Sequence, residues 1–187
     1  MRGTVKAGLG CALIWIFVKM TFFWTGSLNY NIVPPVLLNM LCLIIAISLG
    51  LYLHKRQETE VGNALNDIKN GMTAAVPYIL VVSIFIYFYY NNIDPEYNQH
   101  QLSEAYTEIQ KLLNTPEGLS NIREQNPEFE VLTKEEIFKK LKQGPDGFYS
   151  PTSTMTLSLL GLLVLGTMNS IFITVIYRKV VFRNSAS

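Results

Sequence analysis

The chain is poor in charge and in the residues that most catalytic and metal sites need. Charged residues make up 16% of its 187 positions, against roughly 25% in soluble domains. It has two cysteines and two histidines, and no Gly-rich phosphate loop, Ser-His-Asp set or paired-cysteine metal motif. His100 and Glu104, four residues apart, do not make a metal site by themselves. The sequence therefore predicts no cofactor, no metal and no enzyme activity.

What the chain has in abundance is long apolar runs. Each of four runs approaches the roughly 20 residues that a helix needs to cross about 30 Å of hydrocarbon. They cover Val5–Trp24, Ile32–Leu53, Gly71–Tyr90 and Met155–Tyr177. Tryptophan and tyrosine gather near their ends, as they do at membrane interfaces. We therefore expect an all-α protein, a four-helix transmembrane bundle in a lipid bilayer, with no nucleic-acid partner.

The predicted organisation has three parts. Residues 1–90 hold the first three spans and a cytoplasmic loop at 54–70. Residues 91–154 form a helical insertion, and residues 155–187 hold the fourth span and a tail. Within the loop, apolar residues from Val61 to Ile68 recur at helical spacing, which favours a short helix lying at the membrane interface. Pro77 is expected to begin or kink the third span.

The insertion carries several helix-start signals. Asp94-Pro95 is typical of a helix beginning, with aspartate as the cap and proline in the first position. Thr115-Pro116 predicts a second, short helical turn. Thr133 and Glu136 match a capping box, and Gly144-Pro145 is expected to stop that helix. The insertion should thus contain two or three amphipathic helices.

Basic residues set the expected orientation. Clusters at Arg2/Lys6, Lys55/Arg56/Lys69 and Arg178/Lys179/Arg183 all fall on one side if four helices span. Lysine and arginine accumulate in cytoplasmic segments, so both termini should be cytoplasmic. The insertion, with eleven acidic and six basic residues, then faces the opposite side.

Polar residues inside the spans are the candidate functional residues. Lys19 is a charge in the interior of the first span, and such a group is a functional candidate. The favoured reading is that its stem snorkels to the outer interface. The alternative is an intramembrane polar pair with Asn39, seven residues into the second span. Cys11 and Cys42 should lie at different depths as free, buried thiols without a disulfide.

Two stripes of small or weakly polar residues favour close helix packing. One joins Asn39, Leu43, Ala46 and Gly50 in the second span, and the other runs along the fourth span through Ser158, Leu162, Gly166, Asn169 and Ser170. The alternative is a polar pathway lined by Asn39, Ser83, Thr167 and Asn169. Packing is favoured, because transport paths usually show broken helices or paired ionisable groups.

The order and spacing of several features resemble a known family. These features are the glycine-containing first span, the basic turn His54-Lys55-Arg56, the polar run Gly62–Gly71, the helical insertion, and the fourth span ending Tyr177-Arg178-Lys179. Over most of the chain they resemble an uncharacterised family of four-span inner-membrane proteins, widespread in Bacteroidetes and described only as a domain of unknown function. The resemblance implies a bacterial inner-membrane location with a periplasmic insertion, and it supplies no known activity.

Two functions fit this sequence. The leading expectation is a non-enzymatic accessory or scaffold subunit of an inner-membrane assembly, or a homo-oligomer, with other membrane subunits or itself as partner. The alternative is a small-solute transporter or channel subunit with Lys19 and Asn39 near an outer vestibule. A membrane enzyme ranks third, because the four runs offer no aspartate, glutamate or histidine for acid/base chemistry.

Overall fold

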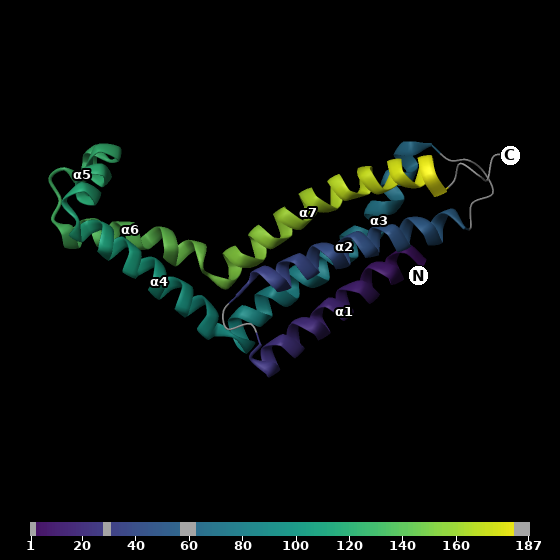
Figure 1. Ribbon diagram of the computed structural model, residues 1–187, viewed down its shortest axis with the longest axis horizontal. Coiled ribbons are helices and arrows are strands. Elements are labelled where there is room, and N and C mark those ends of the chain that lie inside the picture. The colour runs from purple at the N-terminus through teal and green to yellow at the C-terminus, as the bar shows by residue number, and fades with distance from the viewer. Residues whose placement is uncertain (1–2, 28–30, 57–62, 182–187) are drawn as a thin grey trace. The chain divides into compact units, whose positions relative to one another are not determined.

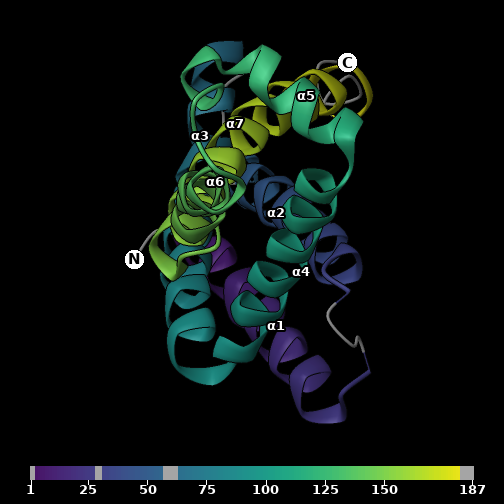
Figure 2. The same ribbon diagram turned by 90° about the vertical axis from the view of Figure 1, so that its left-hand side faces the viewer.

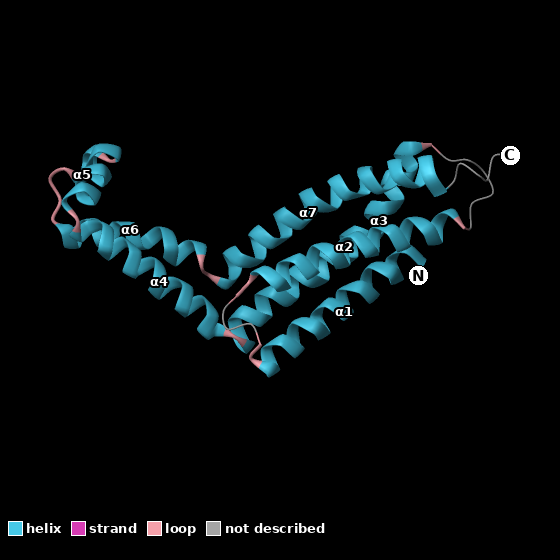
Figure 3. Cartoon of the chain, viewed as in Figure 1, coloured by secondary structure: helices cyan, strands magenta, loops and turns pink. Residues whose placement is uncertain are grey.

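A computed structural model gives the fold, and it describes residues 3–27, 31–56 and 63–181. Throughout these ranges the regular elements are helices, with no strand (Figure 3). The all-α expectation is therefore confirmed.

Four helices are long and apolar enough to cross a membrane. They are α1 (Gly3–Thr25), α2 (Val33–Lys55), α3 (Ala64–Phe88) and α7 (Pro151–Ile176). The π-helical turns η1 (Tyr89–Ile93) and η3 (Tyr177–Val181) continue α3 and α7. The chain is thus a multi-pass membrane protein.

The chain divides into two compact units, 1–85 with 156–187 and 86–155. The first unit is the membrane bundle, in which the four spanning helices lie alongside one another (Figure 1). Its outward side chains include Leu13, Phe17 and Val164, each more than half exposed. Lipid tails solvate such side chains, so their exposure is the ordinary state of a membrane helix.

Helices α1 and α2 are antiparallel neighbours. The Trp15 indole Nε1 donates a hydrogen bond to the Pro35 carbonyl at 3.1 Å, and a β-carbon built on Gly50 would lie 3.9 Å from Thr4 Cα. Counting inward from the Thr4–Gly50 contact places Cys11 and Cys42 at nearly the same depth. The expectation of different depths is wrong, because the antiparallel register brings together positions 31 residues apart. Both cysteines are free and buried.

Helix α3 packs closely against that pair. A β-carbon on Gly8 would overlap the backbone carbonyl of Ala74, and one on Gly50 would overlap the Ala74 side chain. Glycine at both positions therefore lets α1, α2 and α3 approach closely around Ala74. This agrees with the close helix packing expected for the stripe that contains Gly50.

The start of α3 continues into the apolar span, as the segment predicted to lead into that span requires. Ala64–Phe88 is one continuous helix, so residues 64–70 form its first turns. Pro77 lies inside the helix rather than at its start. Val61 and Gly62, part of the predicted interfacial helix, lie outside the described residues. Burial of Asp67, described below, explains why this segment joins the bundle.

The second unit contains α4 (Pro95–Asn114), α5 (Pro116–Gln125), the 3-10 turn η2 (Pro127–Phe129) and α6 (Lys134–Phe148). Helix α5 lies at the end of the unit where α4 ends and α6 begins (Figures 1 and 2). Leu113, Phe129 and Ile137 form a small buried core. This core joins the helices without disulfides.

The predicted helix starts in this unit are confirmed. The Asp94 carboxylate accepts from Tyr97 N at 3.2 Å, and the Thr115 hydroxyl accepts from Gly118 N at 3.2 Å. Thr133 and Glu136 form a complete capping box. These bonds satisfy amides that a helix start otherwise leaves unpaired.

Two details of the insertion prediction were wrong. The Thr115-Pro116 segment begins a ten-residue helix instead of a short turn. Gly144-Pro145 does not stop α6, which continues to Phe148 with Pro145 inside it. Proline lacks an N–H and its ring crowds the carbonyl of residue i−4, but the helix continues beyond it, and the Pro145 carbonyl accepts from Tyr149 N at 2.9 Å.

Candidate functional site

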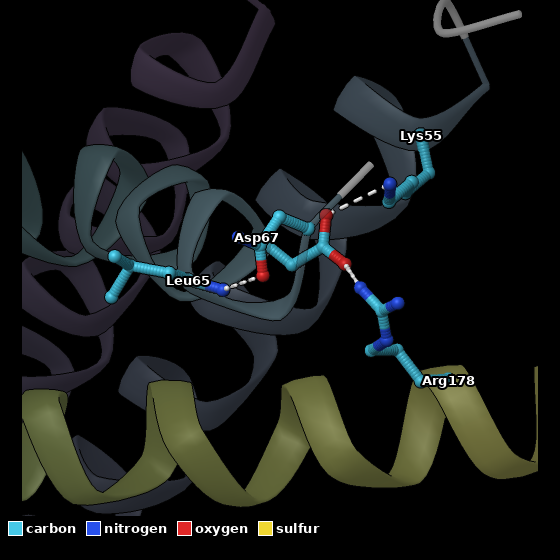
Figure 4. A network of polar contacts seen from close by, with 5 residues as sticks. Lys55, Leu65, Asp67 and Arg178 are labelled. Atoms are coloured by element: carbon cyan, nitrogen blue, oxygen red, sulfur yellow. Dashed lines mark hydrogen bonds and ion pairs between the residues drawn. The ribbon is translucent and has the colours of Figure 1, made fainter. Parts of the chain in front are cut away.

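The most unusual side chain of the bundle is the Asp67 carboxylate, in the first turn of α3. Asp67 is only 1% exposed. The Lys55 Nζ lies 2.8 Å from its Oδ1, and the Arg178 Nη1 lies 2.8 Å from its Oδ2. Figure 4 shows the carboxylate between the two cations. We call these three residues the ion cluster, and the end of the bundle that holds them the basic end.

Local sequence places each member of the ion cluster at a helix end. Asp67 N donates to the Asn63 carbonyl at 3.1 Å as α3 begins, and an acidic residue is favoured in a first helical turn by the helix dipole. Lys55 closes α2, and Arg178 lies in η3 after α7. The end of α2, the start of α3 and η3 therefore meet at one carboxylate, although they are far apart in the sequence.

Two cations contact the one carboxylate of the ion cluster. The Lys55 side chain is 9% exposed and that of Arg178 is 35% exposed. A buried carboxylate is tolerated only when it is paired, and here each oxygen has its own cation.

A polar strip on α7 continues inward from the ion cluster. Ser170 and Thr174 precede Arg178 by two turns and one turn, and are 0% and 1% exposed. A β-carbon built on Gly71 of α3 would lie 3.2 Å from the Ser170 hydroxyl. Neither hydroxyl has a hydrogen-bond partner among the residues that the structure describes. Thr167, by contrast, faces outward and donates to the Leu163 carbonyl of its own helix at 2.9 Å.

Asn39 is satisfied inside the bundle. The Tyr78 hydroxyl lies 2.5 Å from Asn39 Oδ1 and 3.0 Å from the Asn39 carbonyl. Asn39 is 8% exposed and Tyr78 is fully buried. The bond joins the middle of α2 to the middle of α3, so this polar pair acts as a helix–helix contact. Sequence reasoning named Asn39 but not Tyr78, which looked like part of an apolar run.

Lys19 is half-buried on α1. The α1–α2 register separates Lys19 and Asn39 by roughly 6–12 Å along the helix axes, at 1.5 Å per residue. A contact between them requires the lysine stem to extend inward, and the Lys19–Asn39 pair stays a prediction.

The four members of the proposed polar pathway differ in burial. Ser83 is 2% exposed and lies on α3. Thr167 is exposed and Asn169 half-buried on α7. Since the Thr167 hydroxyl is bonded to its own helix, it has little need of a partner from a pathway.

The histidine of the insertion lies beside a glutamate. His100 Nδ1 and Glu104 Oε2 lie 3.8 Å apart on an exposed face, and within the described ranges no three metal-ligating side chains are grouped. A hollow of about 580 Å³ lies beside α5. Its one cation, Arg123, donates to the Leu132 carbonyl at 3.0 Å and thereby holds the chain between α5 and α6.

Bonds within the insertion shift the pKa values of Tyr106 and Glu136. The Tyr106 hydroxyl donates to the Asp146 carboxylate, which joins α4 to α6 and raises the pKa of Tyr106 to about 12. The capping bonds from the Thr133 backbone and hydroxyl lower the pKa of Glu136 below its usual range. Both shifts follow from bonds that build the unit.

Comparison with known proteins decides the family. A family profile described as "Protein of unknown function (DUF4199)" matches residues 6–179. The chain belongs to this family. The match covers both the bundle and the insertion, and Lys55, Asp67 and Arg178 lie within the matched range. No curated protein and no solved structure matches the chain.

Sequence reasoning missed the ion cluster. Lys55 and Arg178 were assigned to basic interface clusters, and Asp67 to a polar loop. One signal was available: Asp67, Glu58 and Glu60 are the only acidic residues outside the insertion. Of these three, only Asp67 lies in the segment before the third span where apolar residues recur at helical spacing. Its two partners come from distant segments, which only the folded bundle reveals.

Proposed function

We propose that this protein is a non-enzymatic accessory or scaffold subunit of an inner-membrane assembly, or a homo-oligomer. One observation supports this best: polar side chains in the spans serve contacts between helices. The Asn39–Tyr78 and Trp15–Pro35 bonds each join two helices at buried positions. Asp67, the buried acid at the start of α3, has a cation on each oxygen, which leaves it poorly suited to act as a general base.

The proposed orientation places the basic end in the cytoplasm and the insertion in the periplasm. Lys55, Arg56, Lys69, Arg178 and Lys179 support it, since cytoplasmic segments are rich in such residues. A fluorescent protein fused to the C-terminus should fold and fluoresce, and periplasmic alkaline phosphatase fused there should be inactive. Active phosphatase at that terminus would reverse the proposed orientation.

Native mass spectrometry after gentle detergent extraction tests the accessory function. A foreign subunit that co-purifies reproducibly, or a defined homo-oligomer, supports it. A monomer under every mild extraction condition would count against it.

Photo-crosslinking in intact membranes adds a matched pair of positions. A crosslinker at Val131, which is 89% exposed, should capture a partner of the insertion, and one at Ile137, which is 0% exposed, should not.

The alternative is a small-solute transporter or channel subunit. The Ser170 and Thr174 hydroxyls favour it, because they are buried near the ion cluster and have no hydrogen-bond partner among the described residues. Solute flux into proteoliposomes should then fall in Lys19→Ala and Asn39→Leu variants that keep the wild-type fold. Flux that equals that of empty liposomes for all solutes tried would remove this alternative.

A further inference from the structure

We propose that α3 and α7 hold ordered water between them, bound by the hydroxyls of Ser170 and Thr174. The inference does not depend on the accessory function. It starts from burial, because Ser170 is 0% exposed and Thr174 is 1% exposed. In the part of the chain that the structure describes, neither hydroxyl has a hydrogen-bond partner. Buried polar groups are normally bonded to protein or to ordered water, so two exceptions one turn apart indicate a ligand.

The helix itself does not supply the missing bonds. A hydroxyl on a helix commonly donates to the carbonyl four residues earlier, and Thr73 and Thr167 do so at 2.9 Å. Within the described residues, Ser170 and Thr174 form no such bond. The Ser170 hydroxyl points instead to α3, where it lies 3.2 Å from the position that a β-carbon on Gly71 would take.

The spacing of the two hydroxyls fits one water molecule. Ser170 and Thr174 are four residues apart on α7, so their β-carbons are about 5–6 Å apart on one face. Two hydrogen bonds of about 2.8 Å each, made to a single water, span this distance. Because Gly71 has no side chain, the Ser170 hydroxyl faces the backbone of α3 directly. Backbone carbonyls can then complete the set of about three hydrogen bonds that a buried water makes.

The proposed site is bounded by apolar atoms on one side. Ser170 and Thr174 lead toward the ion cluster at the basic end. One turn in the other direction, a β-carbon on Gly166 would lie 3.1 Å from Ile79 Cδ1 and 3.6 Å from Ala75 Cβ. These contacts leave the hydroxyls as the polar part of the interface between α3 and α7. We therefore expect the water beside Gly71 and not beside Gly166.

X-ray radiolysis of the full chain in a neutral detergent tests for the water directly. Radicals that form from bound water oxidise the side chains next to it, and mass spectrometry locates the oxidation. Ile47 and Ile79 are a matched pair, because both are isoleucines with 0% exposure. Ile47 lies beside Gly71, 3.3 Å from its β-carbon position, whereas Ile79 lies beside Gly166. Ile47 should be oxidised several times faster than Ile79, and equal rates would overturn the proposal.

Unfolding in the same detergent tests the two hydroxyls. Ser170→Ala and Thr174→Val each remove a hydroxyl, and each should raise the equilibrium constant for unfolding about fivefold, the loss expected for one hydrogen bond. Thr167→Val is the matched control: its hydroxyl is exposed and bonded to its own helix, so the constant should change about twofold at most. Removal of a buried hydroxyl that has no partner stabilises a protein. An unchanged or smaller constant in Ser170→Ala would therefore overturn the proposal.

The two measurements together separate water from a bond to protein. A loss of stability in Ser170→Ala, accompanied by slower oxidation of Ile47 in that variant, supports the water site. The same loss of stability with unchanged oxidation of Ile47 would assign the Ser170 hydroxyl a protein partner, and the proposal would fail.

Discussion

Replacing Asp67 by asparagine tests whether the ion cluster stabilises the bundle. The change removes the carboxylate that Lys55 and Arg178 both contact. Removing one partner of a buried ion pair costs about 3–5 kcal/mol. Asp67 is 1% exposed, but Lys55 and Arg178 have further contacts, so the cost should be about 3 kcal/mol, the lower end of this range.

The two cations should contribute unequally. Arg178 is 35% exposed and partly screened by water or headgroups, so Arg178→Gln should cost about 1–2 kcal/mol, between the exposed and buried limits. Lys55 is 9% exposed, so its coupling to Asp67 in a double-mutant cycle should exceed that of Arg178.

The assay is unfolding of the full chain in mixed micelles, with the free energy of unfolding obtained for each single and double variant. Glu124→Gln, an exposed position in the insertion, is the control and should stay within about 0.5 kcal/mol of wild type. The reasoning would be refuted if Asp67→Asn cost less than about 1 kcal/mol, or if the Asp67 and Arg178 changes were simply additive.

Three further changes test other parts of the molecule. Tyr78→Phe removes a buried hydroxyl that joins α2 to α3, and should lower the free energy of unfolding by about 1–3 kcal/mol in the same assay; no change would contradict that contact. Gly8→Ala should cost about 1–3 kcal/mol because the new methyl overlaps the Ala74 carbonyl, whereas Gly10→Ala, with open space around it, should cost nothing or stabilise slightly. The lowered pKa of Glu136 contributes stability that is present above the ordinary carboxyl pKa and is lost as pH falls through the lowered value; hydrogen exchange at the start of α6, corrected for intrinsic rates, should therefore rise at acid pH in wild type and be insensitive to pH in Glu136→Gln.

The fold class followed from sequence because its causes are local. An apolar run of membrane length must form a helix, since lipid offers no hydrogen bonds to the backbone. The Thr133–Glu136 capping box and the Asp94 cap are likewise short-range, and the structure contains both. The failure at Pro145 shows the limit of such rules: proline weakens a helix locally, and the rest of the helix overrides it.

The candidate site depended on contacts between distant segments. Asp67 and Arg178 are 111 residues apart, and Tyr78 and Asn39 are 39 apart. Neither pair has a sequence pattern. Asn39 stands out as a polar residue in a span, but Asp67 looks like a loop acid, Arg178 like an interface cation and Tyr78 like a member of an apolar run. The depth of Cys11 relative to Cys42 was misjudged for the same reason. The position of a residue along its own span can be read from the sequence, but the register between two spans depends on how the helices pack.

The sequence by itself determined that the chain forms four membrane helices and a capped helical insertion, because hydropathy and capping act over a few turns of one helix. Tertiary structure alone decided which polar groups meet. Antiparallel packing brought the ends of α2 and α7 to the start of α3, and the cost of burying an unpaired carboxylate makes Asp67 the residue on which both cations converge.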